Sequence, residues 1–114
     1  MNTSEKLCWV YMTADSIEEA KNIGQILLEK NLAACVNLLE NMISIYKWED
    51  KLEECQEVVM IAKTCKTLMP KLIETVKSHH RYDCPCILEL PIQGGNPDFL
   101  NWIKSETADT EESQ

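Results

Sequence analysis

The stretch from Met42 to Thr64 most restricts how this chain can fold. Met42–Trp48 places Ile43 and Ile45 on one side of an extended backbone, a period of two that is typical of a β-strand. Glu57–Thr64 holds five apolar residues in a row, as in a strand covered on both faces. Glu49-Asp50-Lys51 joins the two runs, and Asp tolerates the left-handed backbone of a tight turn. Together the two runs predict a β-hairpin.

This hairpin is long for a chain of 114 residues if its pairing continues back to Ala33. Its tip would carry Tyr46 and Trp48 beyond the core, where the same chain offers no partner. An exposed strand edge needs cover, and aromatic residues are enriched at protein interfaces. We therefore predict an oligomer with Tyr46 and Trp48 in the contact between subunits. Stacking of a ligand on these rings is the alternative.

The patterns on either side of the hairpin predict one mixed α+β domain. Helices are expected on one face of an antiparallel sheet, in the split βαβ arrangement of a ferredoxin-like fold. The predicted order is a strand (7–13), a helix (16–31), a strand from residue 33, a strand (57–64), a helix (67–79), a strand (86–92) and a short C-terminal helix from residue 97.

Several local signals mark where these elements begin or bend. Ser16 with Glu19 fits a capping box, Thr67 is a candidate cap for the second helix, and Asn96-Pro97 starts the last one. Glu40-Asn41 interrupts the second strand and predicts a bulge. Pro91 favours an edge position for the fourth strand, because proline donates no ladder hydrogen bond.

Charge and cysteine content restrict partners and location. The domain is expected at residues 1–106 and a disordered acidic tail at 107–114. The net charge is −8, and −4 without the four acidic residues among the last ten, which argues against nucleic acid and anionic membranes. No apolar run is long enough to span a bilayer, and the polar N-terminus lacks a signal-type core. Six cysteines without such a signal predict thiols and a cytoplasmic protein.

A cluster of metal-binding residue types follows the second helix. His79-His80 precedes Cys84-Pro85-Cys86, and in an extended chain Cys84 and Cys86 project to the same side. Two thiolates with imidazoles nearby suit a soft ion such as Cu(I) or Zn(II). The other interpretation is two small buried cysteines beside a solvated helix end, because zinc sites normally show two separated pairs of ligands.

Lys63 stands within an apolar strand, where a lone buried lysine is costly. Lys63 is a candidate to bind a small anion in a cleft between subunits, near Tyr82. The simpler interpretation is that Lys63 forms a salt bridge. Glu57 is interpreted as part of a solvated face of the hairpin.

The chain has only three glycines, no phosphate-binding loop and no nucleophile elbow, so we expect a protein that is not an enzyme.

Motifs along the whole chain resemble one known family. From Leu7 to Lys104, in unbroken order, the chain is similar to the CutA family of divalent-cation tolerance proteins. The residues that carry this resemblance are Leu32–Asn37, Ser44–Glu49, Ile61–Thr64, His79–Tyr82, Leu90–Ile92 and Asn96–Trp102.

The resemblance implies a ferredoxin-like domain that forms a tight homotrimer through its long hairpins. It also implies tolerance of divalent metals, copper binding as in bacterial members, and an association with acetylcholinesterase anchoring as in mammals. The trimer resembles PII-like signalling proteins, which bind small anions in clefts between subunits. Three roles follow as hypotheses: a copper-binding tolerance protein, a trimer that senses an anion near Lys63 and Tyr82, and a scaffold that docks a protein.

The family's copper site is described with a cysteine at the end of the first strand and two histidines after the second helix. His79 and His80 match this pattern, but Met12 stands at the cysteine position, and a thioether is a weaker ligand for Cu(II). Other departures are Arg81 for a proline, Cys86 for a glutamate and Asp50 for the turn glycine. The expected metal ligands in this chain are His79, His80, Cys84 and Cys86.

Overall fold

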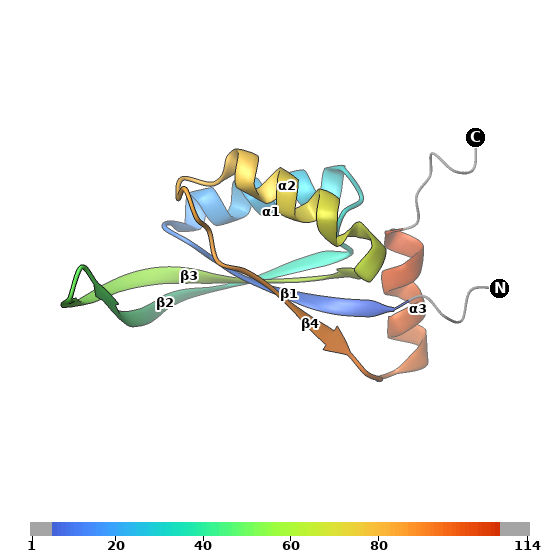
Figure 1. Ribbon diagram of the computed structural model, residues 1–114. Helices are drawn as coiled ribbons and strands as arrows, with labels where there is room; N and C mark the ends of the chain where they lie inside the picture. Colours follow the sequence, from blue (N-terminus) through green and yellow to red (C-terminus); the bar gives the residue numbers. More distant parts are fainter. Residues whose placement is uncertain (1–5, 108–114) are drawn as a thin grey trace.

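The computed structural model describes residues 6–107, which form one α+β unit (Figure 1). The elements follow the predicted order. They are β1 (Leu7–Ala14), α1 (Ile17–Glu29), β2 (Cys35–Trp48), β3 (Lys51–Cys65), the 3₁₀ turn η1 (Lys66–Leu68), α2 (Met69–His79), β4 (Ile87–Ile92) and α3 (Pro97–Glu106).

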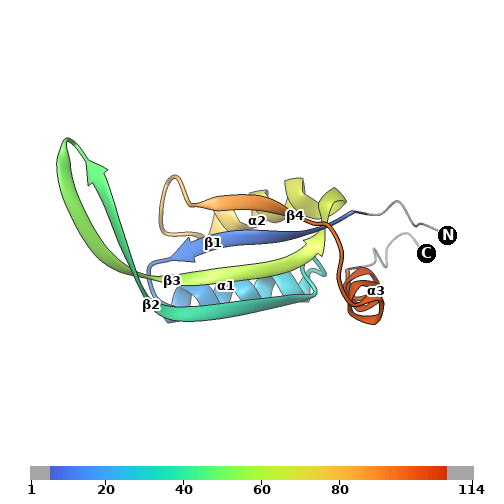
Figure 2. The ribbon, with the colours of Figure 1, turned by 90° about the horizontal axis from the view of Figure 1, so that it is seen from below.

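The four strands form one antiparallel sheet in the order β2-β3-β1-β4. Helices α1 and α2 lie side by side on one face of the sheet, and α3 packs at the end of the sheet where β4 finishes (Figures 1 and 2). Strand β4, which contains Pro91, is an edge strand. The prediction of a ferredoxin-like fold with a C-terminal helix is confirmed.

The long hairpin is formed by β2 and β3 and extends well past the helices (Figure 2). Trp48 pairs with Lys51, so Glu49 and Asp50 alone make the turn. Their φ angles are 51° and 67°, the left-handed values that a type I′ hairpin turn requires at both positions. The predicted bulge is present as a register shift between Leu39 and Met42.

The core lies between the helices and one face of the sheet. On β1 the alternate residues Cys8, Val10 and Met12 are at most 1% exposed, while Trp9 between them is 41% exposed. Helix α1 contributes Ile23 and Leu27 to this core, and α2 contributes Leu72 and Val76. Leu7 and Thr13 near the ends of β1 are also buried, so only the central part of this strand is covered on a single face.

We call the face of the sheet away from α1 and α2 the open face. The strand register places on it Trp9 of β1, Leu39 of β2, Lys63 of β3 and both Leu88 and Leu90 of β4. The four apolar members of this set are between 41% and 57% exposed. The described chain therefore leaves a broad apolar surface uncovered.

The helix caps agree with the sequence in two of three cases. Ser16 Oγ accepts a hydrogen bond from the Glu19 N–H at 3.1 Å, and the Asn96 side chain accepts one from the Asp98 N–H at 3.0 Å. Thr67 is not a cap, because η1 precedes α2 and moves its start to Met69; the N-cap residue is Leu68.

The ends of the domain differ slightly from the prediction. Thr107 was expected in the acidic tail but is the buried C-cap of α3, and its hydroxyl donates to the carbonyl of Ile103 at 2.7 Å. Strand β4 begins at Ile87 rather than at Cys86. Residues 1–5 of the predicted domain and 108–114 of the predicted tail lie outside the described residues.

Candidate functional site

His79 is the last residue of α2 and is exposed to solvent. Its Nδ1 lies 2.9 Å from the carbonyl oxygen of Thr75, which can only accept, so Nδ1 carries the ring proton. The Nε2 atom then presents a lone pair, and it has no hydrogen-bond partner among residues 6–107. Metal-binding histidines commonly donate their second ring N–H to a backbone carbonyl in this way. His79 is therefore suited to bind a metal ion through Nε2.

His80 is in a different environment, because its side chain is only 1% exposed. Its Nε2 donates to the carbonyl oxygen of Thr13 at 2.8 Å, and its Nδ1 accepts from the Tyr82 N–H at 3.1 Å. This pattern assigns the neutral tautomer with the proton on Nε2. Both ring nitrogens hold other parts of the chain, so His80 is a structural residue in the isolated subunit.

Glu19 connects the start of α1 to the segment after α2. One carboxylate oxygen accepts from the Asp15 N–H at 2.9 Å, in place of the Ser16 N–H expected for a capping box. The other accepts from the Arg81 N–H at 2.6 Å and lies 3.5 Å from Nδ1 of His80. The sequence indicated only the cap, because the contact with Arg81 joins residues 62 positions apart.

The two cysteines after α2, Cys84 and Cys86, differ in their exposure to solvent. Residues 81–84 form a bend and β4 starts only at Ile87, so Cys84 and Cys86 are not part of a strand. Cys84 is exposed, whereas Cys86 is half-buried. Burial, and then the nearby Glu57 carboxylate, raise the pKa of the Cys86 thiol, which disfavours the thiolate that a metal requires.

The predicted metal ligands are not gathered into one site within the subunit. Among residues 6–107, no three His, Cys, Asp or Glu side chains are placed to hold one ion. Met12, at the position of the family's cysteine, is fully buried in the core and cannot reach an ion outside it. His79 and Cys84 are exposed to solvent, whereas the His80 side chain is buried and Cys86 is half-buried.

Tyr82 and Glu57 join the segment after α2 to the base of the hairpin. The Tyr82 hydroxyl donates to Glu57 Oε2 at 3.1 Å, and the Ser44 hydroxyl donates to Glu57 Oε1 at 2.7 Å. Burial and the Glu57 carboxylate raise the pKa of Tyr82, so the phenol stays protonated. The interpretation of Glu57 as a solvated residue was wrong, because it is half-buried with both oxygens bonded. Glu57 directly precedes a buried apolar run in the sequence, and this position could have indicated that its side chain is partly buried.

Lys63 lies on the open face, where its ammonium group donates to the Asn37 side chain and to Cys35 Sγ. The ammonium nitrogen is 5.9 Å from the centre of the Trp9 ring. No carboxylate within residues 6–107 forms an ion pair with it, so the expected salt bridge is absent from the described chain. Lys63 lines an open cavity of about 330 Å³ together with Trp9 and Phe99.

Lys63 and Tyr82 do not share a cleft within one subunit. Tyr82 contacts Glu57, and Lys63 lies six residues further along β3, which is about 20 Å at the rise of a strand. A cleft that includes both Lys63 and Tyr82 would therefore need surfaces from different subunits, as the prediction of a cleft between subunits requires.

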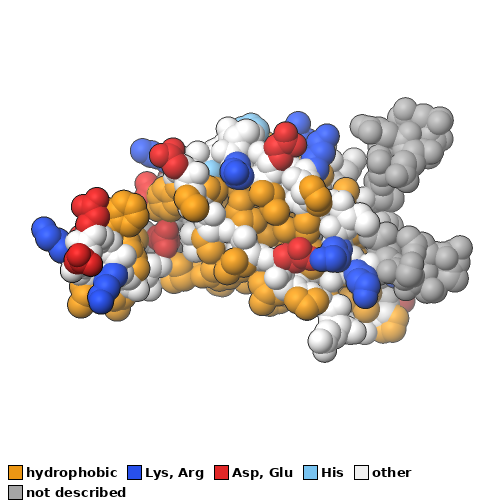
Figure 3. Space-filling model, viewed as in Figure 1, with side chains coloured by type: hydrophobic (Ala, Val, Ile, Leu, Met, Phe, Trp, Pro, Cys, Tyr) orange, Lys and Arg blue, Asp and Glu red, His pale blue; other side chains and the backbone are white. Residues whose placement is uncertain are grey.

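Tyr46 and Trp48 are on the outer half of the hairpin, and neither is buried by the described chain. Ile43, Ile45 and Leu52 on the same arms are also exposed, Leu52 at 76%. Figure 3 shows hydrophobic side chains along the hairpin and across the sheet, with charged side chains at the hairpin tip, over the helices and at the other end of the molecule. No helix among residues 6–107 is both long and apolar enough to cross a membrane.

Comparison with known sequences identifies one protein family. The family model of the CutA1 divalent ion tolerance protein matches residues 8–106. The divalent-cation tolerance protein CutA of Thermus thermophilus is 42% identical over 98 residues, which cover 86% of this chain and 95% of the relative. Protein CutA of the mouse is 42% identical over 97 residues, or 85% of this chain, but these residues span only 55% of the mouse protein.

Solved structures agree with the sequence matches. A CutA1 structure from Oryza sativa superimposes with a TM-score of 0.89 at 38% identity, covering 91% of this chain and 95% of that one. The divalent cation tolerance protein of Thermus thermophilus gives 0.87 at 40% identity, covering 90% and 99%. The Archaeoglobus fulgidus structure, described as a periplasmic divalent cation tolerance protein, gives 0.86 at 42% identity, covering 89% and 98%. With the family's fold and motifs in place, this chain belongs to the CutA1 divalent ion tolerance protein family.

Proposed function

We propose that the protein is a cytosolic, non-catalytic homotrimer that contributes to tolerance of divalent cations. One observation supports the proposal of a trimer. The β2–β3 hairpin projects past the core, and four of its apolar residues are more than half exposed: Ile43, Ile45, Trp48 and Leu52. Large exposed apolar surfaces mark interaction sites, and a long strand edge without cover is prone to pair with another chain. The open face adds a second apolar surface next to it, and the family resemblance supplies the number of subunits.

The trimer is tested by shortening the hairpin. Ile43 pairs with Gln56, so residues 44–55 can be replaced by Asn-Gly with the register kept. We expect sedimentation equilibrium to give three times the 13.1 kDa chain mass for the unmodified protein and one chain mass for the shortened one. If the shortened protein still sediments as a trimer, the outer part of the hairpin does not join the subunits.

We also propose that copper, as Cu(I), binds at the segment after α2. The support is the lone pair on His79 Nε2 and the exposed thiol of Cys84, because thiolate and imidazole ligands suit soft ions. His80 and Cys86 fit less well, since His80 uses both ring nitrogens and the raised pKa of Cys86 keeps its thiol protonated. Any further ligands would come from another subunit.

Native mass spectrometry of the reduced protein with one equivalent of Cu(I) per chain tests this site. We expect one copper per chain, lost in His79→Ala and in Cys84→Ser but kept in Cys35→Ser, which removes a thiol on the open face. Equal copper loading in all three variants would contradict the site while leaving the trimer untouched.

A second function, sensing of a small anion, is favoured by the position of Lys63. Its ammonium group lines the 330 Å³ cavity beside Trp9 and has no carboxylate partner in the described part of the chain. Thermal stabilisation by nucleotides or carboxylates that disappears in Lys63→Ala would support this function. Stabilisation that persists in Lys63→Ala would exclude Lys63 as the binding group.

A further inference from the structure

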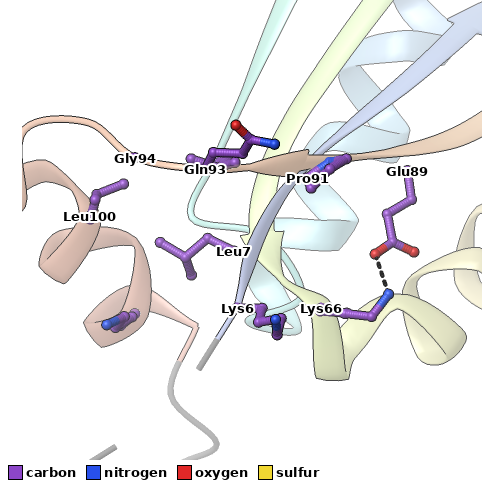
Figure 4. A pocket seen from close by; sticks show the side chains of 10 residues that line it. Lys6, Leu7, Lys66, Glu89, Pro91, Gln93, Gly94 and Leu100 are labelled. Atoms are coloured by element: carbon purple, nitrogen blue, oxygen red, sulfur yellow. Dashed lines mark hydrogen bonds and ion pairs between the residues drawn. The ribbon is translucent and has the colours of Figure 1, made fainter. Parts of the chain in front are cut away.

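A larger cavity lies at the opposite end of the sheet from the hairpin tip, between the start of β1, the end of β4 and α3 (Figure 4). Its volume is about 900 Å³, within the range of pockets that hold small molecules. None of the residues assigned above to copper or to the hairpin contact lines it. Figure 4 shows Leu7 near its centre, with Leu100 of α3 on one side and Lys66 on the other.

The lining of this cavity is basic although the chain is acidic. Lys6, Lys66 and Lys104 line it, three of the 11 basic residues in a chain of net charge −8. Glu89 is the only acidic residue of the lining, which therefore carries a net charge of +2. Such a local field opposes that of the whole protein and attracts anions to this place.

The three lysines differ in what they contact. Lys66 forms an ion pair with Glu89 at 2.8 Å, and this carboxylate raises the pKa of Lys66 (Figure 4). Within residues 6–107, the ammonium groups of Lys6 and Lys104 have no hydrogen-bond or ion-pair partner. Two cations on the rim are therefore available to a ligand, while the third is held in position.

The rest of the lining is mainly apolar. Leu7 pairs with Ile92 across β1 and β4 and is itself buried, while the exposed Pro91 and the half-buried Ile92 and Leu100 supply the apolar part of the lining. Pockets that bind organic molecules combine such an apolar lining with a few placed polar groups. An inorganic ion alone would leave the apolar part uncovered.

We propose that this cavity binds a phosphate monoester that carries an apolar group. A phosphate dianion matches the two available ammonium groups, and lysine is a common phosphate ligand that acts as a point charge. The apolar group would lie on Pro91, Ile92 and Leu100. This site goes beyond the proposed function, because it uses neither the copper ligands nor Lys63.

Isothermal titration calorimetry with four related probes tests the proposal. Phenyl phosphate has both recognised features, benzoate has a single charge, inorganic phosphate lacks the ring, and benzyl alcohol lacks the charge. We expect phenyl phosphate to bind at least tenfold more tightly than the other three, and more weakly as salt is raised. Benzoate that binds as tightly would overturn the preference for phosphate. Inorganic phosphate that binds as tightly would overturn the role of the apolar lining.

Paired variants locate the site. Lys6→Gln with Lys104→Gln should weaken phenyl phosphate at least tenfold, whereas Lys71→Gln with Lys77→Gln removes two exposed lysines of α2 outside the cavity and should change nothing. Amide chemical shifts should move at Gly94 and Leu100 on titration. Equal weakening in both pairs, or shifts centred on Lys63, would overturn the site. The solution mass of each variant shows independently whether the trimer is kept.

Discussion

His79 and His80 are adjacent in sequence, yet the structure gives them different roles. His80 is buried between Thr13 and Tyr82, and its loss would leave a carbonyl and an N–H without their partners. We expect His80→Ala to lower the free energy of unfolding by about 2 kcal/mol, since each buried group left unpaired costs about 1–3 kcal/mol. Urea denaturation at matched protein concentration measures this.

His79→Ala is the matched control for that change. His79 is exposed and bonds only to groups of its own helix, Thr75 and Ser78, so its replacement should change the free energy of unfolding by less than about 0.5 kcal/mol. Similar losses in the two variants would contradict the distinction between a structural and an exposed histidine.

Cys8 gives a prediction about alkaline pH. Burial, and then the charge of Glu89, raise the pKa of its thiol from 9.0 to about 11. Between these values the unfolded chain releases the proton before the folded chain does, so the unfolded state binds fewer protons and stability falls as pH rises. At about 1.4 kcal/mol per unit, the free energy of unfolding should fall by about 2–3 kcal/mol from this group between pH 9 and 11.

The contribution of Cys8 is isolated by comparison with a variant. Cys8→Ala removes the thiol, so its free energy of unfolding should decline less steeply over the same range, by about the amount given above. The variant is less stable at pH 8 for packing reasons, and only the slope is compared. Parallel curves for the two proteins would contradict the raised pKa of Cys8.

At the scale of secondary structure, the hairpin turn contains Glu49, a residue type that disfavours the left-handed backbone found there. Glu49 and Asp50 both have positive φ, a region that Asn and Gly occupy at lower cost. We expect Glu49→Asn with Asp50→Gly to raise the free energy of unfolding by about 0.5–1 kcal/mol. Denaturant unfolding at fixed protein concentration measures the gain.

The same two residue types placed inside a strand serve as the control. Glu53→Asn with Glu54→Gly alters paired positions of β3, where Gly and Asn are poor strand formers, and should destabilise the protein. A gain from both double variants would point to the loss of negative charge rather than to the turn conformation.

Elements with local signals were predicted well, and contacts between distant segments were not. The cap at Ser16, the Asn96-Pro97 helix start and the Glu49-Asp50 turn each depend on a few neighbouring residues. Burial of His80 depends instead on Thr13, 67 positions away, and the role of Glu57 depends on Tyr82, 25 positions away. Neither contact leaves a pattern within one stretch of sequence. The cavity beside Lys6 was missed because its residues come from four separate segments.

The described subunit as a whole has two exposed apolar surfaces, one on the hairpin and one on the open face. The hairpin exposes Ile43, Ile45, Trp48 and Leu52, and the open face exposes Trp9, Leu39, Leu88 and Leu90. Burial of such surface contributes about 25 cal/mol per Å², so its contact with other subunits would stabilise an assembly strongly. The 52 Å length of the subunit, against widths of 28 and 21 Å, reflects a hairpin that reaches beyond its own core.

A charge on the hairpin should therefore break the assembly without unfolding the subunit. Ile45 is 68% exposed in the subunit, so Ile45→Lys costs little there, whereas in the trimer it would bury an unpaired ammonium group. We expect sedimentation velocity to show a shift from trimer to monomer with the far-UV circular dichroism unchanged. Lys47→Gln, on the same strand, should remain trimeric. A trimeric Ile45→Lys would place this side chain outside the contact.

We expect the protein to work as a trimer joined through its hairpins, and native mass spectrometry of the unmodified, reduced protein tests this assembly. We expect one dominant species of three times the 13.1 kDa chain mass, stable from micromolar to nanomolar protein. A monomer across that range would contradict it, because the apolar hairpin and open face would then stay exposed in the working protein.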